Sequence, residues 1–309
     1  MLLNITGGAN SMGFKSGFIA VVGRPNVGKS TLINKLTGQK VSIISPKPQT
    51  TRNTIRAIIT DRDSQIILLD TPGIHTPKSK LGEFMVKKAV ESLNDADGVV
   101  YIVEAFDEKP GKTDAMIIEK LKELKPPVIL AINKCDATSR KRIPESINGF
   151  SAEMKFHDVV PMSALNGENV DVLMGIIKGI LPEGVMYFDP DDFTDQPERT
   201  VASEYIREKM LLLLRDEIPH GTGVEITAFK DREDKNIIDI EATIYCDKKS
   251  HKGIIIGKNG AMLKKIGTMA REDLEKLFGT KVFLKLWVKV KEDWRNKNSV
   301  LRDLGYGRE

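Results

Sequence analysis

Short apolar runs and longer amphipathic segments alternate along the first 180 residues or so of the chain. The apolar runs are typical of strands and cover residues 17–22, 55–60, 65–70, 98–103, 128–133 and 158–162. Apolar residues recur at helical spacing between several of them, over residues 29–37, 81–93, 113–124, 143–154 and 170–181. This alternation predicts an α/β fold with a mostly parallel sheet and helices on both faces. Ligands of such folds bind at the carboxyl ends of the strands, so candidate chemistry is expected directly after these runs.

The pattern changes beyond residue 181. Residues 182–200 contain three prolines and many acidic residues, which is typical of a linker. Helical segments are expected after it at residues 201–215, 252–257 and 261–278, and strands at residues 224–230, 237–245 and 281–291. The order helix, two strands, two helices, strand predicts a second, α+β domain.

These changes in pattern predict where the domains lie. We expect the first domain at residues 17–181, the linker at residues 182–200 and the second domain at residues 201–309, with residues 1–16 as a leader that belongs to neither domain.

The composition is that of a folded protein of the cytoplasm. Hydrophobic residues make up 40% of the 309 residues and charged residues 29%, which excludes a disordered chain. Two cysteines, Cys135 and Cys246, cannot form a disulfide framework, so a reducing compartment is expected. No apolar run approaches the ~18 residues of a transmembrane helix.

The net charge of +4 hides a strong asymmetry. Residues 182–241 contain 7 Lys or Arg and 16 Asp or Glu, whereas residues 248–297 contain 14 Lys or Arg and 5 Asp or Glu. A basic segment of this kind indicates a surface for nucleic acid or for an anionic membrane, unless it is simply a solvated helix face.

A phosphate-binding loop follows the first expected strand. The sequence GRPNVGKS at residues 23–30 matches G-x-x-x-x-G-K-S, in which backbone N–H groups surround a phosphate, Lys29 supplies a cation and Ser30 offers a hydroxyl to Mg²⁺. We assign phosphate binding here to Gly23, Asn26, Val27, Gly28, Lys29, Ser30 and Thr31.

Two further segments suit the same phosphates. Asp70 and Gly73 lie in the sequence DTPG after the third strand, where the carboxylate suits a metal-bound water and the Gly73 N–H suits a γ-phosphate; a plain turn is the alternative. Thr50 and Thr51 lie in the sequence QTTR, a loop that either closes on Mg²⁺ or is an ordinary surface loop.

The fifth strand is followed by the sequence NKCD. An Asp136 carboxylate only accepts hydrogen bonds, and guanine offers it two donors on one edge that adenine lacks, so this residue favours GTP over ATP. We assign guanine binding to Asn133, Lys134, Asp136 and, after the sixth strand, Ser163 and Ala164.

In this order and spacing, GRPNVGKS, QTTR, DTPG, NKCD and SAL resemble the motifs of translation-factor-type GTPases. With the surrounding sequence, the chain resembles the Era family from Gly17 nearly to its end. The resemblance implies slow GTP hydrolysis with Mg²⁺, held by Ser30 and by Thr50 or Thr51, of which Thr51 is favoured. Asn26 resembles family members that recruit K⁺.

The resemblance also implies that no glutamine orients the attacking water. Ile74 occupies the position where many switch GTPases carry one. His75 is either a base or a loop histidine without a catalytic role, and the catalytic side-chain base stays unassigned.

A GXXG sequence lies within the basic segment. Alone it is common by chance, but here three isoleucines precede it and an amphipathic segment follows, which resembles a type II KH domain that clamps single-stranded RNA. The candidate RNA contacts are Lys252, Ile254, Ile256, Gly257, Lys258, Asn259, Gly260 and Lys264. The family resemblance implies that the RNA is the 3′ end of small-subunit (16S) ribosomal RNA and that the protein assists assembly of the small ribosomal subunit.

Three alternatives belong to other classes of protein. An ATP-using P-loop enzyme is disfavoured by Asp136, and an RNA-binding protein with a vestigial nucleotide domain is disfavoured by the intact Lys29, Ser30 and Asp70. A peripheral membrane GTPase would place its basic residues on one long amphipathic helix, whereas here they surround a turn. We expect a cytoplasmic monomer, and contact with the inner face of the cell membrane stays open.

Overall fold

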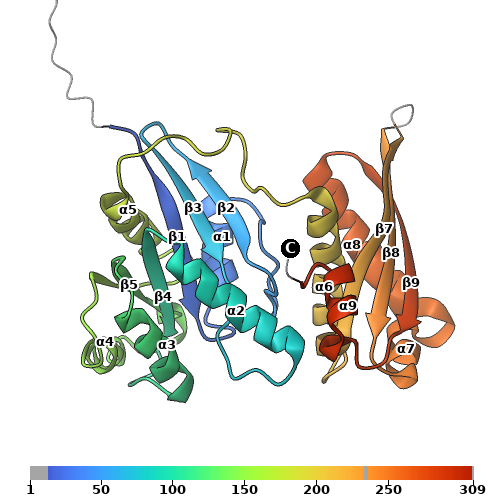
Figure 1. Ribbon diagram of the computed structural model, residues 1–309, viewed down its shortest axis with the longest axis horizontal. Helices are drawn as coiled ribbons and strands as arrows, with labels where there is room; N and C mark the ends of the chain where they lie inside the picture. Colours follow the sequence, from blue (N-terminus) through green and yellow to red (C-terminus); the bar gives the residue numbers. More distant parts are fainter. Residues whose placement is uncertain (1–12, 233–235, 308–309) are drawn as a thin grey trace, which may run out of the picture.

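The computed structural model describes residues 13–232 and 236–307 of the chain. Two α/β bodies lie side by side and are joined by an extended segment, which arches from the end of α5 to the start of α6 (Figure 1). The predicted leader lies outside the described residues up to residue 12. The predicted fold class is confirmed by the sheets and helices of both bodies.

The first body alternates strands and helices as the hydrophobic pattern predicts. Its strands are β1 (Lys15–Gly23), β2 (Ile55–Thr60), β3 (Ser64–Asp70), β4 (Gly98–Glu104), β5 (Val128–Asn133) and β6 (Asp158–Pro161). Its helices are α1 (Lys29–Thr37), α2 (Lys80–Asn94), α3 (Lys112–Lys122), α4 (Ile143–Ser151) and α5 (Val170–Ile180). The sheet has the order β2-β3-β1-β4-β5-β6. Every neighbouring pair is parallel except β2 and β3, which form an antiparallel hairpin at one edge.

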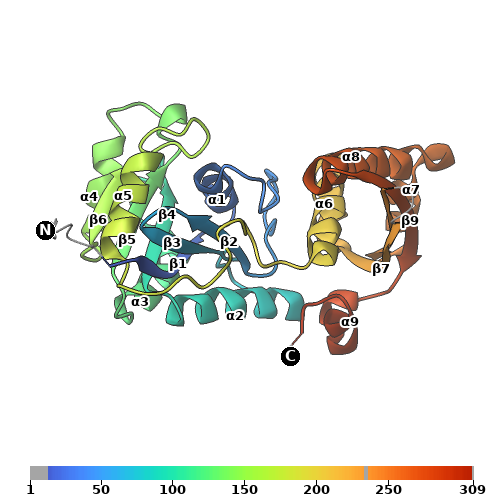
Figure 2. The same ribbon diagram turned by 90° about the horizontal axis from the view of Figure 1, so that it is seen from above.

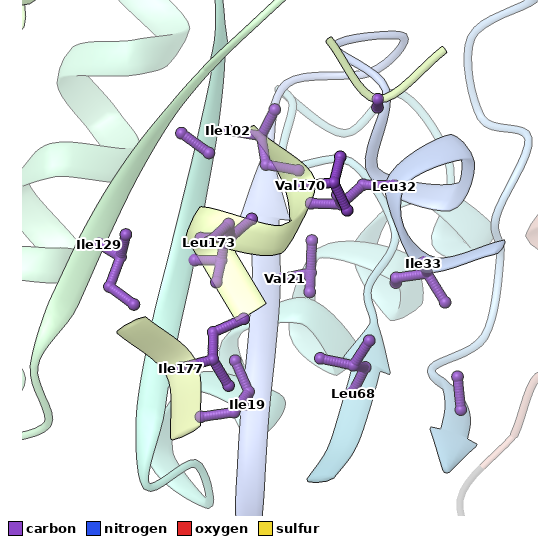
Figure 3. Packing of buried hydrophobic residues seen from close by; sticks show 14 of the residues in the cluster. Ile19, Val21, Leu32, Ile33, Leu68, Ile102, Ile129, Val170, Leu173 and Ile177 are labelled. Atoms are coloured by element: carbon purple, nitrogen blue, oxygen red, sulfur yellow. The ribbon is translucent and has the colours of Figure 1, made fainter. Parts of the chain in front are cut away.

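Both faces of this sheet are covered, which is why its strands are continuously apolar. Ile19 and Val21 of β1 face α1 and α5, where they pack with residues such as Leu32 and Leu173 (Figure 3). The alternate residues of β1, Ala20 and Val22, pack in the cluster that includes α2, α3 and α4. The two clusters fix the carboxyl ends of β1, β3 and β5, and the predicted motifs start there.

The second body has two layers, one sheet and the helices that cover one of its faces. Its elements are α6 (Glu198–Leu213), β7 (Thr222–Arg232), β8 (Ile237–Cys246), α7 (Lys249–Ile256), α8 (Ala261–Phe278) and β9 (Lys281–Val290). The sheet order is β7-β8-β9, with β7 and β8 antiparallel and β8 and β9 parallel. Ile206, Ile255 and Ile266 bring α6, α7 and α8 into one apolar cluster with the strands.

Among the differences between the structure and the sequence prediction, three concern the ends of the two bodies. β1 begins at Lys15, within the predicted leader, because Lys15 pairs with Ser64 of β3. α6 begins at Glu198, within the predicted linker, where an acidic residue suits the positive end of a helix. The chain also continues after β9 into a short 3₁₀ turn, η4 (Trp294–Asn296), and α9 (Asn298–Asp303), which no pattern predicted.

This C-terminal segment joins the two bodies. Trp294, Leu301 and Tyr306 form one buried cluster with Leu81 and Met85 of α2. α9 accordingly lies beside the end of α2 in Figure 2. Within residues 13–232 and 236–307, no helix is long and apolar enough to span a bilayer.

Candidate nucleotide and RNA sites

The loop between β1 and α1 is held in place by Asn133, the last residue of β5. Gly28 has φ 108°, and a Cβ there would lie 2.2 Å from Nδ2 of Asn133, so only glycine fits. Asn133 Nδ2 donates to the Val27 carbonyl at 2.7 Å, and its Oδ1 accepts from the Ala164 N–H at 2.9 Å. One buried amide therefore ties together three of the predicted motifs, and its role in the structure is that of a clamp.

Three oxygen atoms converge beside this loop. Ser30 Oγ donates to Asp70 Oδ2 at 2.8 Å and lies 3.1 Å from Thr51 Oγ1, which itself donates to Asp70 Oδ2 at 3.3 Å. Oδ1 of Asp70 is buried and has no hydrogen-bond partner. Burial raises the pKa of the Asp70 carboxyl, while Lys29 and the hydroxyl groups act in the opposite direction. A hydroxyl–carboxylate oxygen set with an unpartnered buried oxygen fits Mg²⁺.

The two candidate threonines take different places. Thr50 Oγ1 turns back to the Lys47 carbonyl at 2.7 Å, within its own loop. Thr51 is buried and joins Ser30 and Asp70. The geometry thus places Thr51, and not Thr50, in the oxygen cluster.

Lys29 is a buried cation at the base of the loop. It is 6% exposed, and Nζ donates to the carbonyls of Gly23 at 3.2 Å and Arg24 at 2.9 Å. Burial lowers the pKa of Lys29 to about 8, with the negative charge of Asp70 opposing the shift. A bound phosphate would add a negative charge that favours the protonated ammonium group.

The remaining phosphate-side residues line one cavity. It lies between the phosphate-binding loop and the loop of Thr51, and its walls include Asn26, Gly28, Lys29, Ser30, Thr31, Thr51 and Gly73. Asn26 Nδ2 donates to the Pro46 carbonyl at 2.7 Å, so the side chain touches both loops. Gly23 ends β1 and accepts from the Ile74 N–H at 3.3 Å.

The segment after Asp70 carries no polar side chain at the position where a water-orienting glutamine would lie. Ile74 is 1% exposed and belongs to the apolar cluster under α2 and α3. His75 Nδ1 lies 2.7 Å from the Gly73 carbonyl oxygen, and Nε2 lies 3.2 Å from Nε2 of Gln49. His75 therefore connects the two loops that flank the cavity.

The candidate guanine contacts gather at the ends of β5 and β6. Lys134 has φ 67° and its ammonium pairs with Glu104, while Asp136 lies exposed on the next turn, η1 (Cys135–Ala137). Ser163 is fully buried and its Oγ accepts from the Asn166 N–H at 3.1 Å. Among the candidate guanine contacts, the exposed Asp136 carboxylate is therefore accessible as a hydrogen-bond acceptor for a ligand.

The GXXG sequence forms a tight turn between α7 and α8. Gly257, Asn259 and Gly260 have φ values of 74°, 51° and 78°, and a Cβ on Gly257 would lie 2.7 Å from Cβ of Met262. Lys258, Asn259 and Lys264 are exposed around the turn, and Ile254 is 49% exposed beside it. Lys252 and Ile256 are half-buried, so the turn presents cations next to apolar side chains.

Comparison with known proteins adds the family. Residues 18–134 match the model of a 50S ribosome-binding GTPase family, and residues 217–295 match that of a KH domain family. GTPase Era of Ruminiclostridium cellulolyticum is 55% identical over 295 residues, which span 96% of this chain and 98% of that protein. GTPase Era of Caldicellulosiruptor saccharolyticus is 56% identical over the same length. The chain belongs to the Era family of GTPases.

Two crystal structures of Era proteins share the fold of this Era-family chain over 96% of its length. One is Era in complex with MgGDPNP and nucleotides 1506–1542 of 16S ribosomal RNA; the other is a variant of Aquifex aeolicus Era bound to GDP and AlF₄⁻. Each has a TM-score of 0.92 and 42% identity, and each match covers 96% of this chain and all of the other. The predicted family, the GTPase activity and the order of GTPase and KH domains are thereby confirmed.

The structure also shows residues of the Era-family chain whose importance the sequence pattern did not indicate. The loop of residues 43–52, which we call the switch loop, contacts the KH domain along much of its length. The Ile44 N–H donates to Oε1 of Glu208 at 3.1 Å, Arg207 bonds to the Thr50 carbonyl, and Arg52 donates to the Thr222 carbonyl at 2.7 Å. In the sequence, only the position of Arg52 directly after Thr51 could have pointed to these contacts between the switch loop and the KH domain.

Proposed function

We propose that this GTPase binds the 3′ end of 16S ribosomal RNA through the turn at Gly257–Gly260 and assists assembly of the small ribosomal subunit. The observation that carries the proposal is the exposed turn itself, with Lys258, Asn259 and Ile254 presented together. It stands in a chain that matches an Era–16S RNA complex over 96% of its length.

On the RNA side, each residue type has a distinct task. Lys252, Lys258 and Lys264 supply attraction to phosphates that does not depend on base sequence. The glycines let the RNA backbone approach the main chain, and Ile254 and Ile256 offer apolar surface to bases. The turn therefore clamps a single strand rather than a duplex.

On the nucleotide side, we assign the phosphates of GTP or GDP to the loop of residues 23–31. Lys29 pairs with the outer phosphate oxygens, Ser30 and Thr51 would hold Mg²⁺, and the Asp70 carboxylate would supply a hydrogen-bond acceptor beside it. When bound, Mg²⁺ neutralises negative charge on the phosphate oxygens. Asn133, Lys134, Asp136, Ser163 and Ala164 surround the guanine, with Asp136 accepting from its two donors. Because Ile74 has no polar group, another side chain, a backbone group or a partner orients the attacking water.

We propose further that a potassium ion lies beside the phosphates at Asn26. Support comes from the contact of Asn26 with the Pro46 carbonyl, which brings amide and carbonyl groups of both loops together. GTP hydrolysis rates measured in matched KCl and NaCl buffers should then favour KCl. Equal rates would contradict the proposal.

The switch loop connects the two activities. Thr51 faces the proposed metal, and residues on either side of it contact the KH domain. A γ-phosphate that favours one position of this loop must therefore favour one arrangement of the domains. We propose that the RNA affinity depends on the bound nucleotide.

The test is a binding titration of a labelled oligonucleotide with the sequence of the 16S 3′ end. Affinities are measured with GDP–Mg²⁺ and with a non-hydrolysable GTP analogue and Mg²⁺, and we expect a ratio of about 5–150, the usual range of allosteric coupling. A scrambled oligonucleotide is the control for base-independent binding. Equal affinities in both nucleotide states would contradict the coupling, and equal affinities for both oligonucleotides would contradict the RNA assignment.

A further inference from the structure

Thr51 and Arg52 are consecutive residues that contact different domains. Thr51 is 5% exposed, and its hydroxyl faces Ser30 and Asp70 in the GTPase domain. Arg52 is 1% exposed, and its guanidinium lies inside the KH domain. Since one peptide unit joins them, a backbone displacement of one residue also displaces the other.

The guanidinium of Arg52 occupies a cradle that the KH domain builds from backbone and aromatic rings. Nη1 donates to the Thr222 carbonyl at 2.7 Å and Nη2 to the His220 carbonyl at 3.1 Å. The guanidinium carbon lies 5.8 Å from the ring centre of Trp294 and 5.9 Å from that of Tyr306. A guanidinium group fits this cradle because it is planar, can donate to two carbonyls at once and can stack on aromatic rings. The ammonium group of a lysine cannot do all three.

The C-terminal segment supplies the aromatic rings of the cradle and holds them in place. Trp294 Nε1 donates to the Gly221 carbonyl at 2.9 Å, and the rings of Trp294 and Tyr306 stack with centres 6.4 Å apart. Both rings belong to the apolar cluster that includes Leu81 and Met85 of α2, the helix after the DTPG segment. The cradle therefore touches the chain segments that follow both Thr51 and Asp70.

We propose that Arg52 is a positioning residue for GTP hydrolysis, which acts by holding Thr51 toward the metal site while its guanidinium is seated in the KH-domain cradle. A loop residue left free must lose conformational freedom each time it ligates the metal, and the cradle removes that cost beforehand. The C-terminal segment is in this way part of the hydrolytic apparatus. The inference rests on the proposed role of Thr51 as a Mg²⁺ ligand.

The first test is the kinetics of full-length Arg52→Ala. Misplacement of Thr51 should lower kcat by about tenfold or more and raise the Mg²⁺ concentration needed for half-maximal rate, while GDP affinity stays within about twofold because GDP has no γ-phosphate for Thr51 to face. Arg52→Lys should recover part of the rate, since an ammonium reaches one carbonyl without stacking. Arg56→Ala is the matched control, because Arg56 is half-exposed and pairs with Asp195 of the linker, outside the cradle.

The second test does not depend on hydrolysis. In a Trp287→Phe background Trp294 is the remaining tryptophan, and Trp287 is an exposed residue on β9. The exchange of GDP for a non-hydrolysable GTP analogue with Mg²⁺ should change Trp294 emission, and Arg52→Ala should abolish this change. An emission that does not respond in the parent, or that responds as strongly without Arg52, would overturn the inference.

Different results would contradict the metal-ligand role of Thr51 and the positioning role of Arg52. If Thr51→Ala retains the parental kcat, the metal-ligand role of Thr51 is wrong. If Thr51→Ala loses activity but Arg52→Ala retains it, the ligand role stands and the positioning role is wrong. If Arg52→Ala lowers GDP affinity in parallel with kcat, Arg52 merely stabilises the fold, and the positioning role is again wrong.

Discussion

The nucleotide site and the RNA turn of this chain are built in opposite ways. At the nucleotide site Lys29, Asp70 and Asn133 are buried; Lys29 donates to carbonyls of its own loop, and Asp70 and Asn133 bond to groups of other motifs. At the RNA turn Lys258, Asn259 and Lys264 are exposed. A buried network makes each member costly to remove, because its partners are left unsatisfied. Exposed cations contribute separately and are screened by salt, so the loss of one should be modest and nearly additive.

The largest effect is expected from Lys29→Ala. Loss of a buried cation that meets phosphate costs about 3–5 kcal/mol, which corresponds to a loss of GTP affinity of about 100- to 4,000-fold. RNA affinity without nucleotide should stay within about twofold of the parent, because no contact of the turn changes. Isothermal titration with GTP measures the first and oligonucleotide binding the second. Lys35→Ala, an exposed lysine on the same helix, is the control; a similar loss there would contradict the assignment.

Asp136→Asn comes next, because the exposed carboxylate is replaced by an amide that can donate. Two donors of guanine then face a donor group, and GTP affinity should fall by about 100-fold, as expected for mispaired polar groups. Xanthosine triphosphate, which presents a carbonyl there, should gain affinity. Competition of labelled GTP by both nucleotides measures the change, and Asp171→Asn on the exposed start of α5 is the control. Unchanged guanine preference would exclude Asp136 as the base reader.

A smaller loss is expected at the turn, from Lys258→Asp combined with Asn259→Asp. We expect RNA affinity to fall by about tenfold, and the slope of log affinity against log salt to shrink by about one, as for one lost phosphate contact. GTP affinity should not change. Lys155→Asp combined with Ser151→Asp, at two exposed residues of the GTPase domain, makes the same change of three charges and controls for the overall charge. An equal loss of RNA affinity in that variant would show that net charge, rather than the turn, determines binding.

The sequence predicts best what is local to the chain. Spacing within about twenty residues predicts the strands, the loop at residues 23–30 and the GXXG turn. In the structure the loop follows β1 and the turn follows α7, as expected. The contacts of Arg52 with Thr222 join residues 170 apart in the sequence, and no periodicity marks them. α9 spans only six residues and was missed for the same reason, because it is stabilised by packing on α2 rather than by its own pattern.

Asn133 shows a second limit of motif-based prediction. Its motif assigns it to the guanine site, and the structure adds a task that the motif does not state, because its amide connects Val27 and Ala164. A motif reports that residues belong to one site, but the tasks within the site are set by distances that only the fold fixes. The same holds for Thr50 and Thr51, which are adjacent in the sequence but whose hydroxyl groups have different partners in the structure.

A cluster of four charges lies between the two regions, at the domain interface. Lys40 of the GTPase domain pairs with Glu208 at 2.7 Å and with Asp273 at 3.1 Å, and Lys209 pairs with the same two carboxylates. Burial alone would raise the pKa of Asp273, but the hydrogen bonds from Lys209 and Lys40 outweigh it and hold the pKa below its ordinary value. The cluster thus favours the ionised carboxylate when the domains are in contact.

Asp273→Asn should give the smallest effect, with a distinctive pH dependence. A carboxyl whose pKa is lowered by folding stabilises the folded chain above its unfolded pKa and loses that contribution as the pH falls through the folded value. The variant should therefore be less stable by about 1 kcal/mol at pH 7, since Lys209 keeps Glu208 as a partner. The difference between the two proteins in thermal unfolding should persist unchanged from pH 7 to pH 4.5 and vanish only below the ordinary value of 3.8.

Glu272→Gln, the exposed neighbour on α8, should show no such dependence. A difference that fades already near pH 6 would show that a histidine, rather than Asp273, controls the contact between the domains.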